Sequence, residues 1–149
     1  MNRTPAFWDS SALVPLCVRQ AGSRQAQLYL RKFDFVVWWG SFVEVHSAIC
    51  RLHRAQEITD VDKQGAVARL RLLSRGWREV LPDDQVRDLA MESLDNYFLR
   101  AADSLQLAAS LTWCQKRPSR KSFICGDRRL AQAAKAVGFS VLEISIANP

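Results

Sequence analysis

Short apolar runs alternate along the chain with longer segments in which apolar residues recur every three or four positions. The short runs are rich in aromatic and β-branched residues and are bounded by Asp, Gly or Pro, which is typical of buried strands. The longer segments have helical spacing. The expected strands are 6–8, 35–38, 77–81, 122–125 and 141–146. The expected helices are a short one near residue 10 that Pro15 interrupts, then 23–32, 42–54, 60–74, 84–98, 101–114 and 130–137.

Several residues mark the ends of these elements. Ser41 and Asp83 precede helical patterns and are expected to be N-caps, since their side-chain oxygens can accept from the first free N–H groups. Gly138 follows another helix and is a typical C-terminal cap residue. The segment 101–114 is the most apolar helix of the chain and is expected to be central and buried on most sides.

The order of the elements predicts the fold class. Strands that alternate with helices form βαβ units, whose right-handed crossovers give a parallel sheet covered on both faces. We therefore expect an α/β fold with an αβα sandwich of about five strands. No repeat, low-complexity tract or long linker divides the 149 residues, so one domain over 1–149 is expected. Ligands of such sheets bind at the carboxyl ends of the strands, where strand order reverses.

Composition limits the classes of function. Apolar residues make up 48% of the chain and charged residues 24%, which are the values of a globular protein rather than a disordered one. The formal charge of +6 favours a polyanionic partner such as RNA, DNA or an acidic protein. No stretch is as apolar as a membrane span, and the N-terminus lacks the uninterrupted apolar run of a signal peptide. A soluble cytoplasmic protein is expected.

The cysteines and histidines do not suggest a metal site. Cys17, Cys50, Cys114 and Cys125 lie far apart in apolar segments without a Cys-x-x-Cys pair, which predicts buried free thiols in a reducing compartment. His46 and His53 are seven residues apart and project from one helix face. No third nitrogen or sulfur ligand lies near them in the sequence, so a zinc site is not favoured.

Four acids stand apart from the others, which mostly crowd into residues 57–95. Asp9 and Asp127 directly follow predicted strands. Glu44 lies in the first turn of the helix that follows the predicted strand 35–38. Asp103 is the one acid in the most apolar helix. Taken alone, Asp9 fits a helix N-cap as well as a ligand. The acids of segment 84–98 are expected to form a solvated face instead.

Gathering such acids requires a cation. A buried carboxylate such as Asp103 needs a partner, and two charges about 5 Å apart repel by roughly 3 kcal/mol at an effective dielectric near 20. Carboxylates without histidine suit Mg²⁺ or Mn²⁺, since hard ions prefer oxygen ligands. Such an ion activates water and stabilises negative charge on a phosphodiester. Phosphodiester hydrolysis therefore fits both the acids and the basic composition.

Four stretches resemble the motifs of one protein family. They are 8–14 with Asp9, 41–45 with Glu44, 100–105 with Asp103, and 123–130 with Asp127. In order and spacing, over essentially the whole chain, they resemble the motifs of PIN-domain ribonucleases, and within that family the VapC-type toxins of bacterial toxin–antitoxin pairs. The resemblance implies a sheet of order 3-2-1-4-5, a Mg²⁺ or Mn²⁺ site, RNA cleavage, a homodimer, and an antitoxin whose tail occupies the active groove.

The resemblance also assigns residue roles. Asp9, Glu44 and Asp103 match the three core acids, which bind the metal and catalyse, and Asp127 matches the more variable fourth. Ser11 matches a small hydroxyl residue that often supports the site. The fourth motif usually has Thr or Ser where this chain has Cys125. A thiol is a poorer hydrogen-bond partner than a hydroxyl, which weakens the expected support of Asp127.

Other interpretations stay open at this point. Arg128 and Arg129 could bind RNA phosphate or simply neutralise the neighbouring acids. The basic loop 116–121 could steer RNA or be merely solvated, and it precedes a strand, which places it opposite the acids. The rival function is a non-catalytic RNA- or protein-binding module of the same fold, although such a module has no reason to keep costly carboxylates together. A DNA nuclease of the flap-endonuclease type would need additional helical parts.

Overall fold

A computed structural model describes residues 2–145, which contain a five-stranded, entirely parallel sheet of order β3-β2-β1-β4-β5. The strands are β1 (Thr4–Trp8), β2 (Phe33–Trp38), β3 (Arg78–Val80), β4 (Ser122–Cys125) and β5 (Ser140–Glu143). The helices are α1 (Ser10–Cys17), α2 (Ser23–Leu30), α3 (Ser41–Arg54), α4 (Asp60–Ser74), α5 (Asp84–Asn96), α6 (Ala101–Trp113) and α7 (Arg128–Val137). The expected α/β class and strand order are confirmed.

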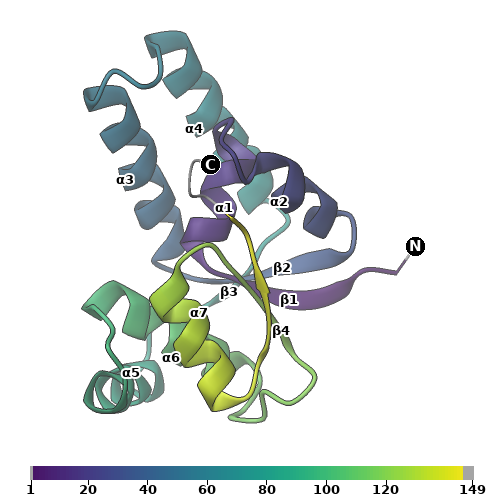
Figure 1. Cartoon of the computed structure of the whole chain (residues 1–149), viewed down its shortest axis with the longest axis vertical. Helices are drawn as coiled ribbons and strands as arrows, with labels where there is room; N and C mark the ends of the chain where they lie inside the picture. Colours follow the sequence, from purple (N-terminus) through teal and green to yellow (C-terminus); the bar gives the residue numbers. More distant parts are fainter. Residues whose placement is uncertain (1, 146–149) are drawn as a thin grey trace.

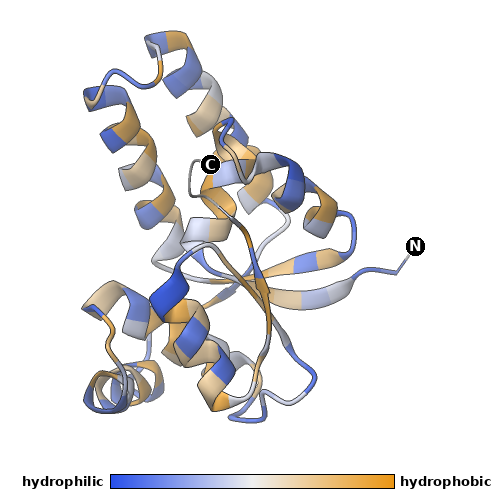
Figure 2. Ribbon diagram, viewed as in Figure 1, coloured by the Kyte–Doolittle hydropathy of each residue, from blue (hydrophilic) through white to orange (hydrophobic). Residues whose placement is uncertain are grey.

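Helices cover both faces of the sheet and complete a three-layer arrangement, with α1 to α4 on one face and α5 to α7 on the other (Figure 1). Alternate residues of each strand enter opposite cores, because side chains of a strand point to opposite faces. Phe7 of β1 packs with α5, α6 and α7, whereas its neighbours Ala6 and Trp8 pack with the other helices. Hydrophobic residues accordingly concentrate in the sheet and on the helix surfaces against it (Figure 2).

The helix predicted to be central is α6. Its residues Gln106, Leu107, Ala108, Ala109 and Ser110 are all buried, and it contacts α5, α7, β2 and β3. The cap residues Asp83 and Gly138 are also confirmed. Asp83 accepts a hydrogen bond from the Val86 backbone at 2.9 Å, and Gly138 ends α7 with φ of 116°, a conformation that favours glycine.

Two predictions about helix ends were wrong. Ser41 is not an N-cap but the first residue of α3, and Gly40 precedes it without a side-chain cap. A Cβ atom on residue 40 would lie 2.5 Å from Trp38 Nε1, so the close approach of the chain to this indole selects glycine there. Pro15 does not interrupt the first helix, since α1 continues through it to Cys17. Pro15 and Leu16 are both buried, and this burial offsets the hydrogen bond that proline cannot make.

Other boundaries differ from the prediction by a few residues. The second strand begins at Phe33, two residues early, because β2 pairs with β1 from Thr4 onward. The last strand is β5 rather than 141–146, and it ends where Glu143 pairs with Cys125, the last residue of β4. Residue 146 lies outside the described residues. Strand ends thus follow the length of the neighbouring strand.

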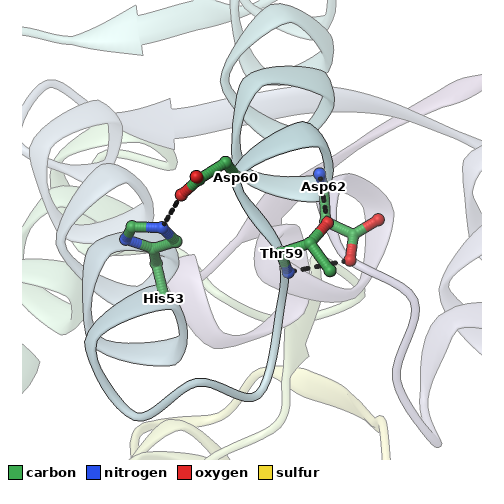
Figure 3. A network of polar contacts seen from close by, with 4 residues as sticks. All are labelled: His53, Thr59, Asp60 and Asp62. Carbon is green, nitrogen blue, oxygen red and sulfur yellow. Dashed lines mark hydrogen bonds and ion pairs between the residues drawn. The ribbon is translucent and has the colours of Figure 1, made fainter.

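The turn between α3 and α4 is held by three polar contacts (Figure 3). His53 Nε2 lies 2.6 Å from Asp60 Oδ1. Thr59 and Asp62 form a reciprocal capping box at the start of α4, with hydrogen bonds of 3.1 and 3.0 Å. His53 therefore bonds to the next helix, while His46 is exposed.

None of the helices within residues 2–145 is long and apolar enough to cross a membrane.

Candidate active site at the carboxyl end of the sheet

The four separate acids lie at the carboxyl end of the sheet. Asp9 directly follows β1, Asp127 follows β4, and Glu44 lies in the first turn of α3, the helix after β2. Asp103 lies in the first turn of α6. Because β1 stands between β2 and β4, the acids meet where the strand order reverses, the usual ligand position in such sheets. The first turns of α1, α3 and α7 converge there (Figure 1).

Asp9 is the most buried of these acids, with 3% of its surface exposed. Its carboxylate accepts hydrogen bonds from the Ser11 backbone N–H at 3.2 Å and from the Ser11 hydroxyl, and so caps α1. The Ser11 hydroxyl oxygen also accepts from the Gly126 N–H at 2.8 Å. Ser11 therefore ties Asp9 to the loop that leads to Asp127, and capping does not exclude Asp9 from the site.

The electrostatic environment of Asp9 disfavours its charged form. Burial raises the pKa of the Asp9 carboxyl from an ordinary 3.8 to about 7, against the lowering effect of the hydrogen bonds from Ser11. The negative charges of Glu44 and Asp103 raise this pKa further. Asp9 therefore retains a proton in weakly acidic solution unless a cation compensates its charge.

Glu44 is fixed by two donors from different helices. The Ser10 hydroxyl donates to Glu44 Oε1 at 3.1 Å, and Gln106 Nε2 donates to Oε2 at 2.9 Å. The same Ser10 hydroxyl lies 3.5 Å from Asp9 Oδ1, so one residue links two of the acids. Burial raises the pKa of Glu44 despite these hydrogen bonds, and the charge of Asp103 adds to the rise.

Asp103 and Asp127 form the outer part of the site. Burial raises the pKa of Asp103, and the charge of Asp127 raises it further, whereas Arg100 and Arg129 lower it. Asp127 Oδ1 accepts from the Leu130 N–H at 2.9 Å and caps α7. Arg128 and Arg129 are both exposed. The charge of Arg129 therefore acts on Asp103, and both interpretations of Arg128 and Arg129, phosphate binding and neutralisation, stay open.

Cys125 contacts the backbone of Asp127 rather than its carboxylate. Its sulfur accepts from the Asp127 N–H at 3.2 Å and lies 3.6 Å from Asp9 Oδ2. Burial raises the pKa of this thiol, so it remains protonated and can donate. The thiol is therefore a weak hydrogen-bond partner of Asp9, whereas the Asp127 carboxylate bonds to the backbone of α7. All four cysteines are free, as predicted, although Cys17 and Cys50 are only partly buried.

Three polar residues of this network were missed or misassigned in the sequence: Ser10, Ser41 and Gln106. Gln106 is fully buried, and its Nε2 lies 2.9 Å from both Ser41 Oγ and Glu44 Oε2 and 3.4 Å from Ser10 Oγ. Its Oε1 has no partner among the described residues, a cost of about 1–3 kcal/mol. A lone amide three residues after Asp103, and hence on the same helix face, was the available signal.

The acids form an open group rather than a closed cage. Within residues 2–145, no three Asp, Glu, His or Cys side chains converge closely enough to hold an ion by themselves. The charges of Glu44 and Asp103 are nevertheless close enough to raise the pKa of Asp9, and the charge of Asp103 raises the pKa of Glu44. Mg²⁺ binds to proteins through one or two carboxylates and keeps several waters. The oxygen donors and their unbalanced charge therefore fit this class of ion.

Comparisons with known proteins reveal similarity at the level of structure. No protein-family model and no curated protein matches the sequence. A toxin–antitoxin complex from Klebsiella pneumoniae contains a chain with 16% identity and a TM-score of 0.60, over 85% of this chain and 90% of that one. VapBC2 from Rickettsia felis, bound to a promoter DNA fragment, matches with 5% identity and a TM-score of 0.63 over 95% and 100%.

FitAcB from Neisseria gonorrhoeae is similar at the same level, with 14% identity and a TM-score of 0.61 over 92% of this chain and 96% of that one. At such identities the likeness establishes a shared fold. Together with the five-stranded parallel sheet of order 3-2-1-4-5, it shows that this chain has a PIN-like α/β fold.

Proposed function

We propose that this protein is a Mg²⁺- or Mn²⁺-dependent endoribonuclease that hydrolyses RNA phosphodiester bonds. The observation that supports this most is the position of Asp9, Glu44 and Asp103 near the reversal point of the sheet. There the charges of Glu44 and Asp103 raise the pKa of Asp9, and the charge of Asp103 raises the pKa of Glu44. Carboxylates drawn together out of water destabilise a fold unless a cation joins them. A binding module without a metal would gain nothing from this arrangement.

Asp9, Glu44 and Asp103 would bind the ion partly through its waters, with Asp127 at the outer edge. The bound ion would supply an activated water and stabilise negative charge on the phosphodiester. The chain's own residues prepare the site: Ser11 orients Asp9, and Ser10 and Gln106 orient Glu44. Asp9 must give up its proton to bind a cation, so binding weakens at acidic pH.

The exposed arginines and the net charge supply the attraction to RNA. Arg128 and Arg129 begin α7 beside Asp127, where their side chains can approach a phosphate held near the acids. A formal charge of +6 raises the encounter rate with any polyanion. The proposed substrate contact of both residues rests on this placement.

We propose further that the protein is the toxin of a type II toxin–antitoxin pair, acting in the cytoplasm as a homodimer that a cognate antitoxin neutralises. One chain with the same fold comes from a toxin–antitoxin complex of Klebsiella, and another comes from the VapBC2 structure of Rickettsia, which is bound to its promoter DNA. Both match this chain over at least 85% of its length. Together with the four sequence motifs, this favours a toxin over other hydrolases of the same fold.

The decisive experiment compares RNA cleavage by the wild type and by Asp9→Asn. The wild type should cleave total RNA with Mg²⁺ or Mn²⁺ and stop in EDTA. Loss of a ligand to a catalytic metal removes several kcal/mol of transition-state stabilisation, so Asp9→Asn should be slower by about 100-fold or more. The matched control is Asp88→Asn, which removes the same charge from the exposed face of α5 and should cleave like the wild type.

Full Mg²⁺-dependent activity of Asp9→Asn would show that the site is misassigned. A wild type that binds RNA without cleaving it would favour the non-catalytic module. Expression in cells adds a test of the toxin proposal, because growth should slow with the wild type and recover when the neighbouring small open reading frame is co-expressed. Sequencing of the cleaved ends would identify the RNA.

A further inference from the structure

We propose that Gln106 is a positioning residue, which holds the Glu44 carboxylate in the orientation that receives the metal ion. The inference rests on the proposed function. Gln106 lies on α6, one turn after Asp103, and its amide reaches across to α3. It was not among the residues expected from the sequence motifs.

The amide contacts α3 at two points one turn apart. Gln106 Nε2 lies 2.9 Å from Ser41 Oγ, on the first residue of α3, and 2.9 Å from Glu44 Oε2. Ser41 is fully buried, so this contact anchors the start of the helix as well as the side chain that follows. The same group therefore aligns both the backbone that carries Glu44 and its carboxylate.

The second oxygen of Glu44 is held separately. Ser10 donates to Oε1 at 3.1 Å, so each carboxylate oxygen has its own donor. Two donors from different helices restrict the rotation of the carboxylate and of a long side chain that otherwise samples several rotamers. Each oxygen can accept more than one contact, so the remaining lone pairs stay available for a cation. Ligands held in place in this way bind metals more tightly.

The alternative is that Gln106 only fills the core, and its surroundings argue against this. It is fully buried in an apolar helix between Leu105 and Leu107. Its Oε1 has no partner among the described residues, which lowers the stability of the fold. Methionine would fill a similar volume without a buried polar atom. Packing alone would favour an apolar residue at this position. An amide is explained by the hydrogen bonds that it donates to Ser41 and Glu44.

The test is Gln106→Met, studied in two measurements that do not depend on catalysis. Titration with Mn²⁺, followed by the electron paramagnetic resonance signal of the free ion, should give a dissociation constant about tenfold weaker than that of the wild type. Thermal unfolding in EDTA should give a moderately lower melting temperature, because Ser41 and Glu44 lose a donor while the unpaired Oε1 is also removed. If Gln106 serves only packing, Mn²⁺ affinity should stay at the wild-type value whatever the melting temperature does.

Ser110→Ala is the matched control. Ser110 is also fully buried on α6, but its hydroxyl donates at 2.6 Å to Leu107 O of its own helix and does not contact the acids. Its loss should change the melting temperature without changing Mn²⁺ affinity. Gln106→Asn provides a second variant, which keeps a buried amide but is one methylene too short to reach Glu44, and it should bind Mn²⁺ as weakly as Gln106→Met.

Two results would overturn the inference while leaving the proposed function in place. One is wild-type Mn²⁺ affinity in both Gln106 variants. The other is a loss of affinity that only parallels a fall in melting temperature and that Ser110→Ala reproduces. If the wild type itself binds no Mn²⁺, the positioning role and the metal-dependent function fail together, which distinguishes that case from the first two.

Discussion

Two groups of acids in this molecule have the same chemistry and opposite surroundings. The acids on the outer face of α5 are all exposed: Asp84, Asp88, Glu92 and Asp95. The acids at the carboxyl end of the sheet are withdrawn from water to different degrees, from Asp9 with 3% of its surface exposed to the half-buried Glu44 and Asp103. The first group lies close together along one helix, whereas the second is assembled from four separate segments.

The difference shows that the position of acidic residues in the fold, rather than their number, indicates a functional site. Water screens the charges on α5, so neighbouring carboxylates there cost little. Burial raises the pKa of Asp9, Glu44 and Asp103, and in each case the charge of another acid of the site raises it further. A protein keeps such a group only when something other than stability requires it. The site acids should therefore respond to protons and cations, and the α5 acids should not.

The largest effect expected from this comparison is on stability without metal. The pKa of Asp9 is about 7 in the folded state and near 3.8 when unfolded. Between these values the folded state binds more protons, so the free energy of unfolding falls as pH rises from about 4 to 7. The contribution of Asp9 is about 4 kcal/mol at full extent. Thermal unfolding in EDTA should show this fall in the wild type and a flatter profile in Asp9→Asn.

Asp88→Asn tests whether the effect belongs to the site. Because Asp88 is exposed on α5, its loss should leave the pH dependence as in the wild type. Equal slopes for the wild type and Asp9→Asn would refute the burial argument for Asp9. Flattening by Asp88→Asn would show instead that the overall charge sets the slope.

A smaller effect is expected when the cation is returned. At pH 8, where Asp9 is deprotonated, Mg²⁺ at about 100 times its dissociation constant should stabilise the fold by roughly 3 kcal/mol. For a chain of this size that corresponds to a rise of several degrees in melting temperature. Differential scanning fluorimetry would measure it. The rise should be largely lost in Asp9→Asn and retained in Asp88→Asn, and equal rises in all three would indicate binding elsewhere.

The smallest effect concerns Cys125. A serine at this position would offer Asp9 a stronger donor than the thiol, which lies 3.6 Å from Oδ2. Cys125→Ser should therefore lower the pKa of Asp9 slightly and move the midpoint of the metal-free stability profile to lower pH. The corresponding change in the free energy of unfolding is about 1 kcal/mol. A midpoint that moves to higher pH would mean that the hydroxyl bonds elsewhere and that the thiol is the better partner.

Much of the architecture could be predicted because its signals are local. Strands of a parallel sheet are buried on both faces and appear as short apolar runs, and each expected strand is present. Helix caps such as Asp83 depend on neighbouring residues alone. The strand order came from the resemblance of four motifs, since periodicity does not say which strands are neighbours. Boundaries were less predictable, because β5 ends where its partner β4 ends.

The candidate site was predictable only in part. Asp9, Glu44, Asp103 and Asp127 stood out through their isolation and their positions after strands or at helix starts. Of the residues that bond to them, only Ser11 was named, through the motif resemblance. Ser41 was taken for a cap, because the approach of Gly40 to Trp38 has no local signal. Gln106 was read as part of an apolar helix, since nothing nearby in the sequence shows what its amide would meet.

By itself, the sequence indicated most elements, because each depends on residues within a few positions of one another. The order of these elements indicated the fold class, and four acids stood out by their isolation. Only the tertiary structure decided how those acids are held. Ser10 and Glu44 are 34 positions apart, and Glu44 and Gln106 are 62 apart. Contacts over such separations exist only after α1, α3 and α6 have packed around the sheet, because the packing, not the chain, brings their polar atoms within hydrogen-bonding distance.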